Sequence, residues 1–392
     1  MNAAYLVDYA RSAFTRAHPR KPEVDAWSGE RGDILLGRVI DGLLDRSRLP
    51  GTEIEDLSVG CALPVREQWS FGGRYPQWLS TVGIQCPSRQ IDQQCGSGLA
   101  ALRATAREIQ AGAIDTGLAG GYENMSRVPM GPTLFQEGVL TVPEALQKRD
   151  DLDLTVAMNM GLTAERLARD NGLTREQMDA FAVGSHHKAA RAEQEGWFAG
   201  ERLPLENPAG ELVEQDANIR PETSSARLAE LKPAFSEDGE ITAGNSSPLT
   251  SGAGAALLMS EVAMERHGLL PMARIVAVAD CGVIPEYMGV GAAVAAERAL
   301  RLAGLSSSDI DVWEINEAFS AVPLYAIRSL DIDPERVNLF GGALALGHPL
   351  GATGIRLAGT LARALQHQAG RYGCATACVG GGQGIAMIIE RC

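Results

Sequence analysis

Two residues that could carry out nucleophilic chemistry stand in glycine-rich turns that precede helical segments. Cys95 lies in the run Gln-Gln-Cys-Gly-Ser-Gly at 93–98, and His348 lies in Gly-His-Pro-Leu-Gly at 347–351. The N–H groups and dipole at a helix N-terminus favour a thiolate, and histidine is the usual base for a cysteine. Together the motifs indicate a nucleophilic cysteine with a histidine base. Each alone has an alternative: a small buried cysteine at a tight turn, or a turn histidine that caps a helix.

Two further motifs follow predicted strands. Cys378 ends a strand and is followed by three glycines beginning at Gly380, which would expose backbone N–H groups as an oxyanion hole requires. Asn316 opens the run Asn-Glu-Ala-Phe after another strand, where its amide could hold a water or polarise an oxygen. The alternatives are a buried strand cysteine beside a packing turn and an asparagine that caps a helix.

The elements that must position these motifs follow the pattern of an α/β protein, with short apolar runs alternating with amphipathic stretches. Strands are predicted at 54–61, 116–120, 273–279, 312–315 and 372–379. Helices are predicted at 33–49, 99–110, 292–303 and 354–365.

The middle of the chain, 122–248, is richer in charge and proline and has few strand-like runs. Thr163 is expected to open one helix, and Thr174 with Gln177 has the form of a capping box that opens another. We interpret this segment as a loop subdomain inserted over the α/β body.

The two halves of the chain also resemble each other. In each half, a glycine-rich turn precedes a small-residue helix, a glycine and a strand that ends in glycines. This repetition predicts the duplication of one α/β unit. Cys95 and His348 would then occupy matching helix N-termini and could meet at a shared seam.

Bulk composition excludes several classes of function. The net charge of −14 argues against nucleic-acid binding, which needs a basic face. The seven cysteines are odd in number and irregularly spaced, which argues against a disulfide framework. No cysteine or histidine spacing predicts a metal site, and no apolar run is long enough for a membrane span. We expect a cytoplasmic protein with reduced thiols.

Taken together, the motifs resemble those of the thiolase family, and they do so over essentially the whole chain. The run Gly-Gly-Tyr-Glu-Asn-Met-Ser at 120–126, Asn-Glu-Ala-Phe at 316–319, Gly-His-Pro at 347–349 and Cys-Val-Gly-Gly-Gly at 378–382 match its patterns. The ketoacyl-acyl-carrier synthases share the fold but carry a Cys/His/His set, which this chain lacks.

The resemblance implies a duplicated thiolase fold with two similar halves in five α-β-α-β-α layers. The N-terminal half would be 1–270, with the inserted subdomain 122–248, and the C-terminal half would be 271–392. It also implies a homodimer or homotetramer.

The resemblance further implies a reversible, CoA-dependent thiolytic cleavage of a 3-ketoacyl-CoA through an acyl-Cys95 intermediate. His348 would deprotonate Cys95, and Cys378 would act as the second acid and base. Backbone N–H groups of Cys95 and Gly380 would hold the oxyanion, while a water held by Asn316 would stabilise the enolate with His348. The alternatives are a biosynthetic, acetoacetyl-CoA-forming or other Claisen-condensing enzyme, and a non-catalytic acyl-CoA-binding subunit.

Contacts to coenzyme A are carried over in the same way to Ser247, Met160, Arg220 and Phe319. For Met160 the alternative is core packing, and for Arg220 it is a solvated surface charge. Acyl-CoA and CoA would be substrates, with no permanently bound cofactor and no metal.

The chain departs from the family pattern at a few positions. Asn159 stands where acetoacetyl-specific members have histidine, which favours a longer or unusual 3-ketoacyl substrate. Ser251 and Asp92 also differ from the usual residues, and the change at Ser251 is expected to affect structure more than chemistry. The aromatic segment 69–78 has no assigned role.

Overall fold

The computed structural model describes residues 2–392, apart from the side chain of residue 132. Its main sheet has ten strands, of which nine follow the order β10-β11-β12-β9-β1-β8-β5-β3-β4, with β2 beside β8. The strands of the main sheet are β1 (Tyr5–Arg11), β2 (Thr15–Arg16), β3 (Asp56–Gly60), β4 (Ser88–Ile91), β5 (Thr116–Asn124), β8 (Thr250–Met259), β9 (Ala273–Gly282), β10 (Val312–Ile315), β11 (Tyr372–Val379) and β12 (Gln383–Arg391).

The sheet consists of two halves with the same topology. In the N-terminal half, β3 pairs parallel with β5, and β5-β8-β1 continue antiparallel. In the C-terminal half, β10 pairs parallel with β11, and β11-β12-β9 continue antiparallel. A short antiparallel pairing of β1 with β9 joins the halves. The repeated order confirms the predicted duplication, while the domain boundaries at 270 and 122–248 stay predictions.

Side chains alternate between the two faces of each strand, so each face has its own core. On β8, Ala255 and Leu257 pack in the cluster that holds the apolar residues of α1 (Gly32–Ser47). On the opposite face of β8, Ala256 and Leu258 pack with α3 (Ser97–Ala111) and α14 (Leu350–Gln368).

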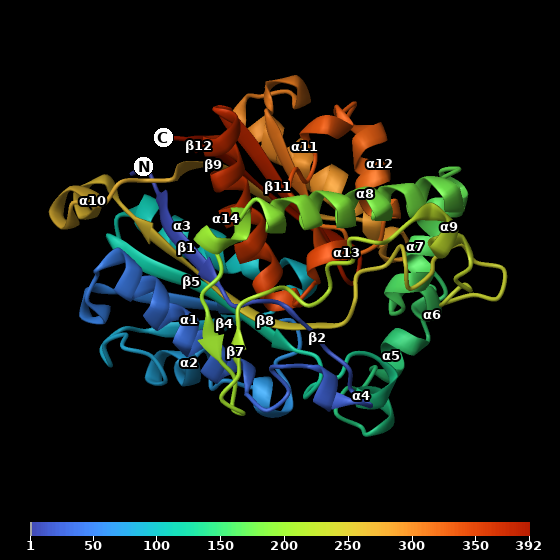
Figure 1. Cartoon of the computed structure of the whole chain (residues 1–392), viewed down its shortest axis with the longest axis horizontal. Coiled ribbons are helices and arrows are strands. Elements are labelled where there is room, and N and C mark those ends of the chain that lie inside the picture. The colour runs from blue at the N-terminus through green and yellow to red at the C-terminus, as the bar shows by residue number, and fades with distance from the viewer. Residues whose placement is uncertain (1) are drawn as a thin grey trace.

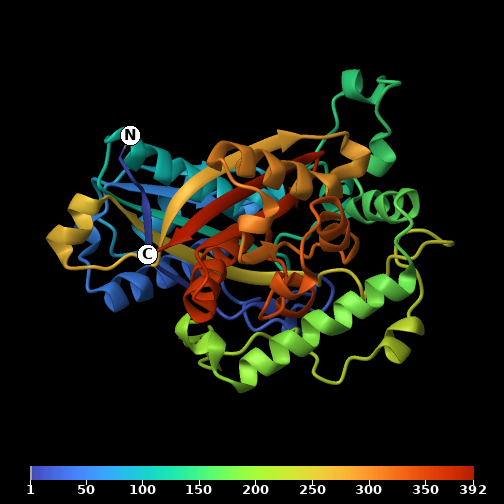
Figure 2. The ribbon, with the colours of Figure 1, turned by 90° about the horizontal axis from the view of Figure 1, so that it is seen from above.

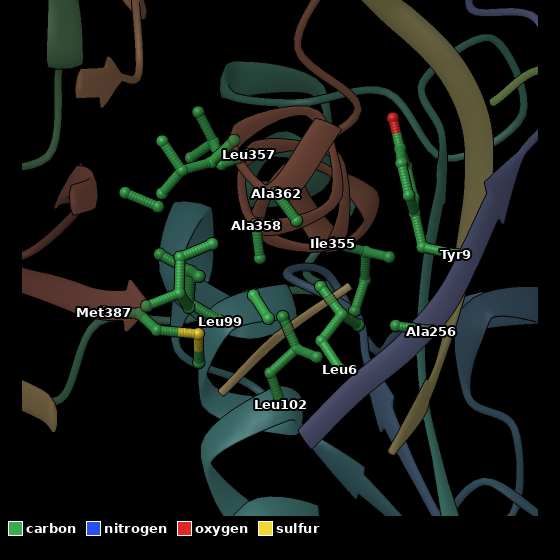
Figure 3. Packing of buried hydrophobic residues seen from close by; sticks show 14 of the residues in the cluster. Leu6, Tyr9, Leu99, Leu102, Ala256, Ile355, Leu357, Ala358, Ala362 and Met387 are labelled. Carbon is green, nitrogen blue, oxygen red and sulfur yellow. The ribbon is translucent and has the colours of Figure 1, made fainter. Parts of the chain in front are cut away.

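The C-terminal half-sheet covers the other side of α3 and α14. On β12, Ile385 and Met387 belong to the same core as these two helices, whereas Ala386 and Ile388 pack with α11 (Gly291–Ala303). Figure 3 shows side chains of α3 and α14 packed beside Met387 and Ala256. The order is therefore helix, sheet, helix pair, sheet, helix, as the predicted five layers require.

The remaining helices lie outside these central layers or in the connection between β5 and β8. They are α2 (Arg74–Trp78), α4 (Pro132–Gln136), α5 (Glu144–Gln147), α6 (Leu154–Ala157), α7 (Met160–Asp170), α8 (Arg175–Gln194), α9 (Ser225–Ala229), α10 (Glu261–His267), α12 (Ala321–Ser329) and α13 (Ala343–Leu346).

The long connection between β5 and β8 carries helices α4 to α9 and the small hairpin β6 (Leu205–Glu206) and β7 (Leu212–Val213). It occupies the right side and the front of the molecule in Figure 1, and Figure 2 shows α8 outside the sheet layers. The predicted capping box at Thr174 and Gln177 is present at the start of α8. The prediction for Thr163 was wrong: α7 begins at Met160, because Asn159 accepts hydrogen bonds from the N–H groups of Gly161 and Leu162.

Among residues 2–392, no helix combines the length and the apolarity that a membrane crossing requires.

Candidate active site

Cys95 lies in a short 3₁₀ turn, Gln94–Gly96, that leads directly into α3. Gln94 adopts a left-handed backbone with φ of 44°, a conformation that is costly for a side chain other than glycine. Ser97 accepts from the N–H of Gln93 at 2.9 Å and donates to the carbonyl of Gln94 at 2.7 Å. These bonds hold the turn that presents the sulfur.

Burial decides the ionisation of Cys95. The side chain is only 8% exposed, and burial raises the pKa of its thiol to about 11, although the backbone N–H groups of Gly380 and of Cys95 itself oppose the shift. The sequence pattern led us to expect a favoured thiolate. The nearby N–H groups do act in that direction, but desolvation outweighs them, so the thiol is protonated in the free protein.

His348 is held at its backbone and at both ring nitrogens. Its N–H donates to Thr250 Oγ1 at 3.0 Å, its Nδ1 lies 2.7 Å from Thr353 Oγ1, and its Nε2 lies 3.3 Å from Asn316 Nδ2. Burial, with a smaller contribution from the charge of Arg356, lowers the pKa of His348 to about 3. The ring is therefore neutral near pH 7.

Asn316 directly follows β10 and is fully buried. It does not cap the following helix, because Ser320 occupies the N-cap position of α12. Its Oδ1 has no hydrogen-bond partner among the described residues. Asn316 therefore has an acceptor available beside the ring of His348.

Cys378 and Gly380 complete the group at the end of β11. Burial, together with the negative charge that Cys95 would carry as a thiolate, raises the pKa of the Cys378 thiol strongly. The backbone N–H of Gly380 lowers the pKa of the Cys95 thiol, against the larger effect of burial. The structure thus brings together the five side chains and backbone groups that the sequence predicted to be catalytic.

A cavity of about 770 Å³ opens beside Cys95 and His348. Most of its wall is apolar, which suits an acyl chain or another apolar ligand segment. It is lined by Cys95, Met125, Met130, Gly131, Phe135, Gln136, Val142, Leu154, Thr155, Met158, Asn159, Met160, Gly161, Phe235, Ser246, Ser247, Pro248, Leu249, Met288, Ala318, Phe319, His348 and Leu350.

Three of the four residues predicted to contact coenzyme A line this cavity. Ser247 donates its N–H to the carbonyl of Ala318 at 2.9 Å, which ties the connection before β8 to the segment of Phe319. Met160 lies at the start of α7 on the same wall. Arg220 is exposed and is not part of the cavity wall.

The residues that depart from the family pattern have structural partners. Asn159 caps α7 and also faces the cavity. Ser251 is buried in β8 and donates to Asp25 Oδ2 at 2.7 Å. Asp92 accepts from the N–H of Gln94 at 2.9 Å, beside the turn of Cys95.

Sequence reasoning missed the role of Glu123, a fully buried carboxylate at the end of β5. It accepts from the N–H groups of Ala62 and Gly351 at 3.0 Å and from Gln68 Nε2 at 2.6 Å. Burial raises its pKa, while these donors oppose the shift. Glu123 thereby fixes the start of α14 beside His348. A charged residue inside an apolar strand was the signal that could have revealed it.

Within the described part of the chain, no group of three or more histidine, cysteine or acidic side chains could hold a metal ion.

Comparisons with known proteins show the family of the chain. The family model of the thiolase N-terminal domain matches residues 7–262, and that of the thiolase C-terminal domain matches residues 269–391. A relative from Bacillus subtilis named 3-ketoacyl-CoA thiolase is 40% identical over all of both chains. One of the same name from Marinobacter nauticus is 40% identical over 98% of this chain and 97% of its own.

A solved structure, that of human mitochondrial 3-ketoacyl-CoA thiolase in complex with CoA, is similar with a TM-score of 0.87 and 31% identity. The similarity covers 100% of this chain and 98% of the human one.

Proposed function

The chain belongs to the thiolase family of acyltransferases, and on that premise we propose that it cleaves a 3-ketoacyl-CoA with CoA to give acetyl-CoA and a shortened acyl-CoA. The observation that carries the proposal is the position of Cys95 and His348 together on the wall of a mostly apolar cavity. In this direction the reaction is the chain-shortening step of fatty-acid β-oxidation.

The first step is the attack of Cys95 Sγ on the 3-keto carbon. The thiol proton passes to His348 Nε2, because the thiol is protonated at rest and needs a base. The carbonyl oxygen becomes an oxyanion, and the backbone N–H groups of Cys95 and Gly380 stabilise it. Both N–H groups lower the pKa of the Cys95 thiol, which supports their role in stabilising negative charge at this point.

The second step breaks the bond between C2 and C3 and leaves an acyl thioester on Cys95. The departing group is the enolate of acetyl-CoA, and Cys378 donates a proton to it. The raised pKa of the buried Cys378 thiol supports this role, because the group remains protonated and available as an acid. A water held by Asn316, with His348, stabilises the enolate oxygen.

The third step returns the enzyme to its resting state. CoA enters, Cys378 takes the proton of its thiol, and the CoA sulfur attacks the thioester carbonyl. The acyl group leaves as acyl-CoA, and Cys95 recovers a proton from His348. The same steps in reverse condense two acyl-CoA molecules, so the supply of substrates decides the direction.

Coenzyme A and acyl-CoA are substrates in this proposal, with no permanently bound cofactor. Ser247, Met160 and Phe319 line the cavity and are proposed to contact the pantetheine and acyl portions. Arg220 remains proposed for the nucleotide end, which would lie outside the cavity. The predicted cytoplasmic location rests on the sequence alone.

The proposal includes assembly with further copies of the chain, as a dimer or tetramer. Among the described strands, β4 pairs only with β3, so its other edge is open. An open strand edge can pair with another chain. Beside it, Trp69, Phe71 and Trp78 are each about half exposed and pack against one another around Tyr75. A second copy that covers this aromatic cluster and the β4 edge would bury both.

Steady-state cleavage of 3-ketoacyl-CoA esters of several chain lengths tests the proposed function. Acetyl-CoA and the shortened acyl-CoA are expected in equal amounts, only when CoA is present, and not with Cys95→Ser. A folded protein that cleaves none of these esters and forms none from acyl-CoA would contradict the proposal.

A further inference from the structure

The ring of His348 is enclosed by two polar side chains whose hydrogen-bonding capacities differ. On one side Nδ1 lies 2.7 Å from the hydroxyl of Thr353, and on the other Nε2 lies 3.3 Å from the amide nitrogen of Asn316. Building on the proposed function, we propose that Thr353 is a positioning residue that fixes His348 in the tautomer able to accept the proton of Cys95.

The hydroxyl of Thr353 has one proton and two neighbours that compete for it. Thr353 Oγ1 lies 2.9 Å from the carbonyl oxygen of Pro349, one turn earlier in the same helix. A carbonyl can only accept, so the hydroxyl proton is donated to Pro349. The hydroxyl oxygen then serves as an acceptor toward the ring, and Nδ1 of His348 must carry the hydrogen.

The longer contact at the other nitrogen favours the same tautomer. An amide nitrogen can only donate, so Asn316 Nδ2 beside Nε2 calls for a lone pair on Nε2. The two contacts come from different elements, α14 and the segment after β10. Both place the proton on Nδ1 and leave a lone pair on Nε2, which faces Asn316 at rest and takes the proton of Cys95 during the attack.

The surroundings make this assignment consequential. Thr353 is fully buried and His348 is 4% exposed, so bulk water does not readily replace a lost partner. Arg356 lies one turn beyond Thr353 on α14 and is paired with Glu314 of β10. Its charge disfavours an imidazolium, so His348 is neutral at rest. The tautomer of this neutral ring decides which nitrogen can accept a proton.

During the attack the Cys95 proton moves to Nε2, and the hydrogen on Nδ1 stays where it is. The imidazolium that forms donates from Nδ1 to Thr353 Oγ1 throughout. Thr353 therefore transfers no proton and touches no substrate. It orients the ring and keeps the lone pair on the side of the cavity, as the partner of a catalytic histidine does in other acyl-transfer sites.

Three variants separate this role from a merely structural one. Thr353→Val keeps a β-branched side chain of similar size but has no acceptor for Nδ1. Thr353→Ser keeps the hydroxyl. Thr360→Val is the matched control, because Thr360 is also a buried threonine on α14, and its hydroxyl bonds to Tyr9 and Glu201 rather than to the site.

We expect Thr353→Val to lower kcat by about 10- to 100-fold with a smaller change in KM, a loss comparable to that of removing an outer partner of a metal-bound histidine. Thr353→Ser should recover most of the rate, and Thr360→Val should keep kcat within about twofold. A Thr353→Val enzyme with a wild-type kcat would overturn the proposal, as would an equal loss in Thr360→Val.

The tautomer itself can be observed by ¹⁵N NMR of histidine-labelled protein, with the His348→Asn variant used to assign the signal among the six histidines. The wild type should show a protonated Nδ1 and an unprotonated Nε2, and Thr353→Val should show a mixture. A protonated Nε2 in the wild type would contradict the proposal. This readout needs no substrate, so it stands apart from any failure of the proposed activity.

Discussion

Cys95 and His348, the residues that exchange a proton in the proposed reaction, are both neutral at rest. Burial raises the pKa of the Cys95 thiol to about 11 and lowers that of His348 to about 3. A standing thiolate–imidazolium pair is therefore disfavoured in the free protein. The proton moves as the sulfur attacks, when the N–H group of Gly380 and the ring of His348 can stabilise the charge that develops.

The depressed pKa of His348 predicts a dependence of stability on pH. Its folded pKa of about 3 lies below the usual 6.5, so the unfolded chain binds more protons between these values. Stability is therefore full above about pH 6.5 and falls as the pH drops toward 3. Urea unfolding at pH 7, 6 and 5 should show a loss for the wild type and a smaller loss for His348→Gln.

His186 provides the comparison for this experiment, because burial lowers its pKa to about 4 while it lies outside the site. His186→Gln should reduce the pH dependence in the same sense without removing activity. If the free energy of unfolding of His348→Gln depended on pH as strongly as that of the wild type, a neutral, buried His348 would be contradicted.

Removal of the polar side chain of Asn316 should lower kcat strongly. Asn316→Ala removes the amide beside His348 Nε2 and the buried Oδ1. We expect kcat to fall about 100- to 1,000-fold, the usual cost of a preorganised oxyanion partner. Asn171→Ala, at the C-terminus of α7, is the control and should change kcat little; a mild effect of Asn316→Ala would reject its role.

At the residue scale, the sequence predicted the residues proposed to carry out the chemistry and missed the residues that position them through hydrogen bonds. Cys95, His348, Asn316 and Cys378 stood out because each interrupts a glycine-rich or strand-end pattern. Glu123 did not, because its partners Ala62, Gln68 and Gly351 lie far away in the chain. Thr353 did not, because a threonine in a helix has no sequence feature that marks a contact with a ring five residues earlier. The positive φ of Gln94 could not be predicted from the sequence, since glutamine has no preference for that conformation.

At the scale of elements, the close approach of α3 and α14 brings Cys95 and His348 together. Both residues stand at the N-terminal ends of these helices, and the helices touch backbone to backbone. A Cβ placed on Gly354 would overlap the backbone nitrogen of Leu99, and one on Gly98 would lie 2.7 Å from the carbonyl oxygen of Gly351. Only glycine allows the helices to lie this close.

Gly354→Ala should therefore damage both stability and catalysis. We expect a loss of about 1–3 kcal/mol in the free energy of unfolding, as for other overpacked sites, and a fall in kcat of at least about 10-fold because the reacting groups separate. Urea unfolding and steady-state cleavage measure the two effects.

Gly184→Ala is the matched control, because Gly184 lies inside α8 and a Cβ there meets nothing within 4 Å. That variant should keep its activity and be as stable as the wild type or more so. If both alanine variants behaved alike, the close helix contact would have no special role.

β8 is a strand that the sequence patterns missed because its composition is unusual for a strand. β8 consists largely of glycine, alanine and serine in its first seven residues, a composition depleted in strands. These small residues are required because α1 packs on one face of β8 and α14 on the other. The requirement comes from tertiary packing, which a local pattern does not reveal.

At the scale of the whole molecule, the two edges of the sheet differ. The outer edge of β10 is covered at Trp313 by a bridge to Val337. The edge of β4 lies beside the exposed aromatic cluster of Trp69, Phe71 and Trp78. This asymmetry points to the β4 side as the proposed contact between copies.

Two charges placed in the aromatic cluster test this assembly. Phe71→Glu combined with Trp78→Glu should reduce the particle mass to that of one chain in analytical ultracentrifugation, because charged groups would face a buried apolar contact. Leu270→Glu is the control, since Leu270 is 84% exposed and lies after α10. Persistence of the wild-type mass in the double variant would contradict an interface at this surface.

The duplication could be predicted because two copies of one pattern recur along the chain, whereas the layer order was implied by the resemblance to the thiolase family. The substrate's chain length could not be predicted in the same way. The cavity wall combines residues from the segment 125–161, from Phe235 and from 246–249 with residues after β10. Its shape depends on how these distant segments pack together.

Single-turnover acylation tests the central claim most directly. The purified protein is mixed with acetoacetyl-CoA or with a medium-chain 3-ketoacyl-CoA without free CoA, and the modified peptide is identified by mass spectrometry. An acyl group on Cys95 that is absent in Cys95→Ser and released by CoA is the predicted result. A folded, CoA-binding protein whose Cys95 stays unmodified with every 3-ketoacyl-CoA tested would contradict the account.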